Sequence, residues 1–139
     1  MASNELWFTE ILPKVYTVLK VRGTERLKTK YPTIKFIKTD SVNDVPVYPT
    51  VYLSEDQYPE IGSTIDNQYV NAVEETVQVD VETNTNENDV RIIMNEIVLQ
   101  MKKMRFSVST VPIYMSDGTN HRAVARFIRT FGADDVFLM

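Results

Sequence analysis

The chain has 139 residues, no cysteine, 43% hydrophobic residues and a formal net charge of −4 at pH 7. This length predicts a single domain, residues 1–139, with a hydrophobic core of its own. The lack of cysteine excludes disulfide frameworks and thiolate chemistry. No apolar run reaches the roughly 20 residues of a membrane-spanning helix, and residues 1–4 do not resemble a signal peptide. We therefore expect synthesis in the cytoplasm and no membrane association.

The charged residues are unevenly distributed along the chain. Residues 1–38 carry eight Lys or Arg and three Asp or Glu, whereas residues 39–90 carry twelve Asp or Glu and no Lys or Arg. Residues 91–139 carry seven Lys or Arg and four Asp or Glu. One interpretation is an ordinary solubilising surface. The other is a surface with two electrostatic poles, which would suit the stacking of identical subunits or would face a polyanion without binding it.

The N-terminal region predicts a helix over residues 5–21. Pro13 favours a start near Leu12, because proline is tolerated in the first turn of a helix but not in its middle. Gly23 is expected to interrupt this helix, with a further turn over residues 24–30.

Two short strands and a long loop are predicted next. Residues 33–38 predict a strand, and residues 45–53 form a second β-rich run. The two prolines in that run leave Thr50 to Ser54 as the better strand. Residues 54–72 show no clean period and predict a long acidic loop, which is either functional or a plain exposed insertion. Its candidate site residues are Asp56, Glu60 and Asp66.

The clearest periodic signal follows. Residues 76–82 alternate valine with polar residues, which predicts a strand with one face on the core. Apolar residues then recur at steps of three and four over residues 90–104, which predicts an amphipathic helix with Asn86 or Asn88 as its N-cap. Three further residues widen the apolar stripe and predict burial on more than one side: Ile92, Val98 and Leu99.

The last elements predict a hairpin. Residues 107–115 form a β-rich run, residues 116–120 contain an Asp-Gly turn signal, and residues 122–131 form the partner strand. Neither face of that last strand is purely apolar, which is typical of a strand near an edge or an interface. The apolar tail at residues 137–139 needs a docking place on this chain or another.

The sequence contains no recognisable catalytic or metal-binding constellation. One histidine, His121, cannot build a usual zinc or iron site without cysteine, and it is expected to be an exposed polar residue. Residues 84–89 lack the glycine and the late glutamate of a calcium loop. Glu74 and Glu75 are interpreted as solvated loop carboxylates, because no apolar pocket is evident that would raise a pKa. We therefore expect no enzyme activity, no metal and no cofactor.

Three arginines form the one basic cluster of the sequence: Arg122, Arg126 and Arg129. Three interpretations stay open: a salt-bridge face between subunits, a solvated strand face, or a contact to DNA. A sequence-specific reader of nucleic acid would usually show a denser basic patch with aromatic residues.

Several short strings occur in an order that resembles the tail-completion proteins of long-tailed bacteriophages, also called tail terminator or head–tail joining proteins, especially those of phages that infect Gram-positive bacteria. The strings are Pro49 to Tyr52, Asn71 to Val73, Glu82 to Asn84, Ile93 to Ile97, Met101 to Phe106 followed by a proline-containing strand, and Arg126 to Arg129. The resemblance covers residues 5–135, and Met101 to Phe106 is its most telling part.

The resemblance implies an α+β fold in which two helices pack on one face of a mixed, mostly antiparallel sheet, in the order helix–strand–strand–strand–helix–strand–strand. It implies a structural virion protein that assembles as a hexameric ring, caps the tail tube and ends tail polymerisation. The expected partners are copies of itself, the tail tube protein and the head connector or stopper protein. The expected location is the tail–neck region of the virion, and the host cytoplasm during assembly.

In such a ring, particular residues have expected roles. Arg122, Arg126, Arg129 and Phe137 are candidates for the subunit interface. The acidic loop is expected at the bore or at a ring face, where negative charge would let DNA slide through without specific binding. The alternatives are another neck, head-completion or tail-tube-like component of the same assembly, or a cytosolic module that binds a small molecule.

Overall fold

A computed structural model describes residues 7–38, 48–55 and 72–132 of the chain. Its elements follow the predicted order of helices and strands and confirm the α+β class. They are a 3-10 helix η1 (Trp7–Glu10), α1 (Ile11–Leu27), β1 (Lys35–Lys38), β2 (Thr50–Glu55), β3 (Ala72–Thr83), α2 (Glu87–Lys103), β4 (Ser107–Asp117) and β5 (Asn120–Gly132).

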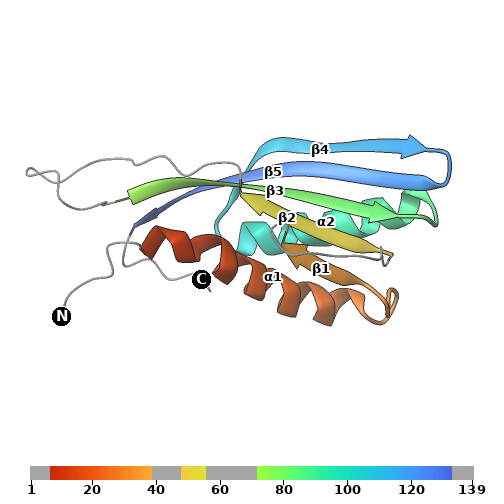
Figure 1. Cartoon of the computed structure of the whole chain (residues 1–139), viewed down its shortest axis with the longest axis horizontal. Coiled ribbons are helices and arrows are strands. Elements are labelled where there is room, and N and C mark those ends of the chain that lie inside the picture. The colour runs from red at the N-terminus through yellow and green to blue at the C-terminus, as the bar shows by residue number, and fades with distance from the viewer. Residues whose placement is uncertain (1–6, 39–47, 56–71, 133–139) are drawn as a thin grey trace, which may run out of the picture.

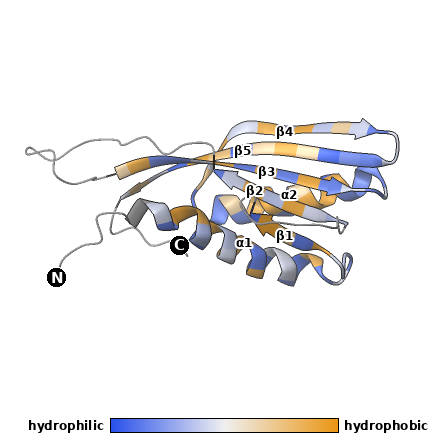
Figure 2. Cartoon of the chain, in the orientation of Figure 1, coloured by the Kyte–Doolittle hydropathy of each residue, from blue (hydrophilic) through white to orange (hydrophobic). Residues whose placement is uncertain are grey.

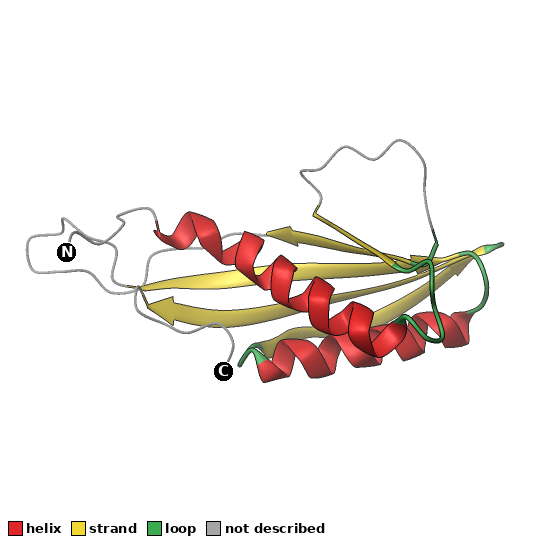
Figure 3. Ribbon diagram, turned by 90° about the horizontal axis from the view of Figure 1, so that it is seen from below, coloured by secondary structure: helices red, strands yellow, loops and turns green. Residues whose placement is uncertain are grey.

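The five strands form one mixed sheet in the order β1-β2-β3-β5-β4. β1 pairs with β2 in parallel, and the other three pairs are antiparallel. Both helices lie side by side on one face of this sheet (Figures 1 and 3). No described element covers the opposite face, which we call the open face.

The core lies between the sheet and the two helices. Val77, Val79 and Val81 of β3 are fully buried and pack in one cluster with Ile93 and Ile97 of α2. The colours along β3 alternate in Figure 2, and buried residues alternate with half-buried ones along the same strand. This arrangement confirms the strand that the valine alternation predicted.

Helix α2 begins at one of the two expected caps. The Asn86 side chain accepts a hydrogen bond from the backbone N–H of Asp89 at 2.9 Å. The prediction of burial on more than one side was wrong for Leu99, whose exposed fraction is 55%. The reason is that α2 contacts the sheet on one side and α1 along its flank, so its outer side has no described element over it.

Helix α1 is longer than its sequence pattern predicted. It starts close to the expected position near Leu12, but it runs through Gly23 without interruption. Gly23 is buried, and a Cβ atom added to it would lie 2.6 Å from Cζ of Phe36 on β1. The glycine therefore permits the close approach of α1 to β1, which a local propensity argument cannot reveal.

We expect the substitution Gly23→Ala to destabilise the chain, although alanine favours a helix by about 1 kcal/mol over glycine. Overpacking against the buried Phe36 ring should cost about 1–3 kcal/mol and outweigh that gain. Urea denaturation would measure the free energy of unfolding of Gly23→Ala, Phe36→Leu and the double variant. The smaller side chain in Phe36→Leu should recover part of the loss, and an additive result would contradict the proposed clash.

The acidic loop was predicted too long at both ends. Ser54 and Glu55 belong to β2, and Ala72 is the first residue of β3, because both strands extend beyond the part whose alternation was plain. The remaining loop residues, with Asp56, Glu60 and Asp66, lie outside the described residues. The apolar tail with Phe137 also lies outside them.

Candidate functional site

The described residues carry no group of three or more His, Cys, Asp or Glu that could hold a metal ion. His121 is half-buried and takes part in a hairpin contact, with Nδ1 at 2.8 Å from Oγ of Ser116. Among the described helices, neither is long and apolar enough to cross a membrane. The features that remain as candidates are surfaces and one buried carboxyl group.

The arginines Arg122 and Arg126 lie on the open face, where each contacts a side chain of β3. The Arg122 guanidinium donates a hydrogen bond to the Asp80 carboxylate, and its Nε lies 3.7 Å from Oε1 of Glu82. Arg126 donates from Nε to Oε1 of Gln78 at 3.1 Å. These pairs form a polar row across β5 and β3 that stays partly in contact with solvent.

The third arginine of the predicted cluster lies on the other side of the sheet. Arg129 donates from Nη1 to the backbone carbonyl oxygen of Met104 at 2.7 Å, and its guanidinium lies 4.2 Å from the ring centre of Phe131. The structure therefore brings Arg122 and Arg126 to one face and separates Arg129 from them. The role of these residues in a subunit interface stays a prediction.

Apolar side chains are exposed on the open face beside the polar row. Ile113 and Met115 of β4 are 53% and 44% exposed. In the antiparallel register they lie opposite Val124 and Arg122 of β5, so they share the face of those residues. We call Ile113, Met115 and Val124 the open-face strip. An exposed apolar row beside charged residues is typical of a contact surface.

The outer edge of the sheet at β4 is poorly suited to pairing with another strand. The register of β4 against β5 shifts between Val108 and Thr110 and again between Thr110 and Ile113. Pro112 lies at the second shift and has no backbone N–H to donate. Bulges and proline protect an edge strand from further pairing, so a partner would contact the face of the sheet rather than extend it.

The interpretation of Glu75 as a solvated loop carboxylate was wrong. Glu75 lies in β3 on the helix-facing side, is fully buried, and has no hydrogen-bond partner for either carboxylate oxygen among the described residues. Burial, followed by the interaction with the neighbouring Glu55 carboxyl group, raises the pKa of Glu75 from 4.5 to about 10. The carboxyl group is therefore protonated at neutral pH.

Sequence reasoning could have found Glu75 but not the open-face strip. The alternation of residues 76–82 continues backward through Glu75 to Val73, and this continuation places both on the buried face. The sequence also showed that polar and apolar residues alternate over residues 107–115. Which face of the sheet lacks a covering layer depends on where both helices pack, and no local pattern contains that information.

Comparison with protein-family models and with curated protein sequences finds no match for the chain. Its function is therefore argued from the resemblance of short strings, the fold and the exposed surfaces.

Proposed function

We propose that the chain is a structural subunit of a long-tailed bacteriophage that caps the tail tube as a homo-oligomeric ring. The ring ends tail polymerisation and forms the tail side of the head–tail joint. The observation that carries this proposal is the uncovered sheet face with its open-face strip. A face of this kind suits a contact with a partner, and identical subunits in a ring would supply one.

The geometry of the exposed surfaces suits a heterologous contact. A ring requires that one surface of a subunit contacts a different surface of the next, so that the rotation closes. The open face presents Ile113 and Met115 next to the row of Arg122 and Arg126. An apolar centre with a polar rim is the usual anatomy of a protein interface.

The resemblance supplies the proposed partners. These are neighbouring copies in a ring, with six as the expected number, the tail tube protein below the ring and the head connector or stopper protein above it. DNA would pass through the bore without sequence-specific binding. The proposed location is the tail–neck region of the virion, with assembly in the host cytoplasm. The chain is proposed to act without catalysis and without a cofactor.

Mixing the purified chain with isolated tail tubes and with DNA-filled heads tests the proposal. Negative-stain images should show ring-shaped density at one end of the tubes and no binding to heads in the absence of tails. Binding to filled heads alone would instead indicate a head-completion protein. Binding to neither would contradict a role in the head–tail joint.

A further inference from the structure

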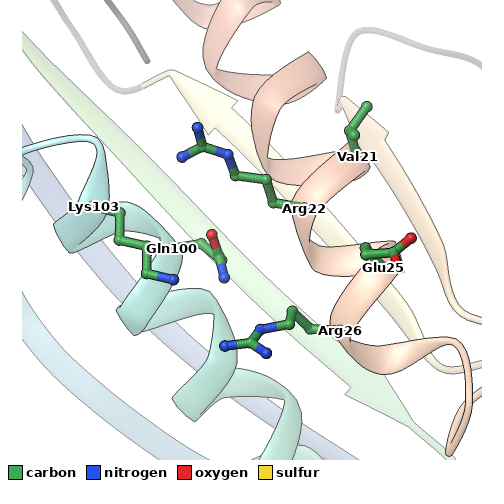
Figure 4. A pocket seen from close by; sticks show the side chains of 6 residues that line it. All are labelled: Val21, Arg22, Glu25, Arg26, Gln100 and Lys103. Carbon is green, nitrogen blue, oxygen red and sulfur yellow. The ribbon is translucent and has the colours of Figure 1, made fainter. Parts of the chain in front are cut away.

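A groove of about 440 Å³ lies between the two helices. Val21, Arg22, Glu25 and Arg26 of α1 line it together with Gln100 and Lys103 of α2. Figure 4 shows Arg22 and Arg26 reaching from α1 toward α2, and Lys103 and Gln100 reaching back from α2. Gln100 is 2% exposed. The groove therefore has a buried amide at its floor and three cations around it.

The cations differ in how far their charge is compensated. Nε of Arg26 lies 3.9 Å from Oε2 of Glu96, which also accepts a hydrogen bond from Nε2 of Gln100 at 2.6 Å. Arg22 and Lys103 have no ion-pair or hydrogen-bond partner within the described residues, although they extend toward the same groove. An anion between them would relieve the repulsion of two like charges.

The groove is better suited to a protein carboxylate than to a nucleic acid backbone. Glu25 pairs with Lys28 and Glu96 pairs with Arg26, so among the described residues the groove offers only Arg22 and Lys103 as uncompensated cations, which suits one or two carboxylates better than a run of phosphates. Val21, which is 64% exposed, adds an apolar surface at the rim. A nucleic-acid site would usually have a denser basic patch with aromatic residues for stacking. A short acidic segment with some apolar side chains fits this mixture of charge and apolar surface.

We propose that this groove binds the acidic segment at residues 56–66 of a second copy of the chain. That segment contains Asp56, Glu60 and Asp66, with Tyr58, Ile61 and Ile65 between them and no Lys or Arg. This inference rests on the proposed ring, because it places the segment at the contact between neighbouring subunits rather than free in the bore.

The chain has enough length for this contact. The sixteen residues 56–71 connect the described end of β2 to the start of β3. At about 3.3 Å per residue, half of these residues could extend about 26 Å from the sheet, and the other half could return to it. The groove faces away from the sheet, which lies behind the helices in Figure 4. The segment connects two strands of the sheet, and the groove lies between the helices, so the contact would join two different surfaces.

A synthetic peptide of residues 56–66 with a fluorescent label tests the groove directly. Fluorescence anisotropy should show saturable binding to the purified chain, and the variant Arg22→Glu/Lys103→Glu should weaken it at least tenfold. The matched control is Lys20→Glu/Lys35→Glu, which makes the same change of charge at exposed residues outside the groove. A scrambled peptide of the same composition should bind more weakly than the native order.

Three results would overturn the inference: equal losses in both charge-reversal variants, no binding of the peptide to any variant, or groove-dependent binding of a DNA duplex without binding of the peptide.

The titration is independent of the phage experiment. It needs only the purified chain, so failure of peptide binding together with normal binding to tail tubes would reject the groove and leave the proposed function standing. If the chain binds the peptide but does not bind tail tubes, the proposed function is rejected.

Discussion

Replacing Glu75 with glutamine is expected to stabilise the folded chain at pH 7 by about 3 kcal/mol. The side chain is fully buried and its oxygens have no partner among the described residues. In the unfolded chain the carboxyl group is ionised at pH 7, so folding must take up a proton. Glutamine has nearly the same shape and needs no proton, and it therefore removes this cost.

The pH dependence of the wild-type stability follows from the same shift. The folded pKa of about 10 lies above the ordinary value of 4.5, so the native state binds the proton more tightly. The contribution is fully present below the unfolded pKa and is lost as pH rises toward the folded pKa. Urea denaturation between pH 5 and 9 should show stability falling by up to about 1.4 kcal/mol per pH unit from this group.

Two control variants separate Glu75 from its neighbours. Glu74→Gln changes a half-buried carboxyl group on the open face and should leave the pH slope nearly unchanged. Glu55→Gln removes the neighbouring carboxyl group and should lower the folded pKa of Glu75, so that the fall in stability ends at a lower pH. It should not abolish the fall, since burial is the larger cause of the raised pKa. A slope in Glu75→Gln equal to that of the wild type would contradict the burial of a protonated Glu75.

The double substitution Ile113→Asp/Met115→Asp is expected to weaken capping of the tail tube at least 100-fold while the chain stays folded. Both side chains are about half exposed on the open face, so the fold does not depend on burying them. In the proposed ring they lie in the contact between subunits, where two added carboxylates would be desolvated. The one nearby cation among the described residues, Arg122 opposite position 115, already pairs with Asp80. Counting capped tubes in negative-stain images over a range of protein concentrations measures the effect.

The matched control for this surface is Leu99→Asp. Leu99 is 55% exposed on the outer side of α2 and does not line the groove between the helices. This substitution should leave capping unchanged. Equal losses for both surfaces, or unchanged capping by the double variant, would reject the open face as the contact. Circular dichroism and urea denaturation would show whether each variant remains folded.

Much of the fold could be predicted because β3 and α2 have strong periods of their own. The alternating valines of β3 and the apolar stripe of α2 each mark the side of the element that packs against the core. Asn86 caps α2 through a contact with Asp89, three residues away. Gly23 shows where this reasoning ends. Its effect on α1 depends on the ring of Phe36, which is thirteen residues away in the sequence, and only the packing of α1 on β1 reveals it.

The candidate surfaces were less predictable than the fold. The two-residue repeat of a strand already indicated that Arg129 lies on the opposite face from Arg122 and Arg126, but it did not indicate which face the helices cover. The groove depends on how two distant helices lie against each other. Arg22 and Lys103 each occur in an ordinary amphipathic helix, and neither helix alone indicates that the two cations share a site.

The length of the phage tails tests whether this chain caps the tail tube. In a phage whose gene for this chain is deleted, electron microscopy of infected-cell lysates should show tail tubes of widely varying length and DNA-filled heads without tails. Supplying the chain in trans should restore one tail length and joined particles. Tails of normal, uniform length attached to heads in the deletion strain would contradict the account.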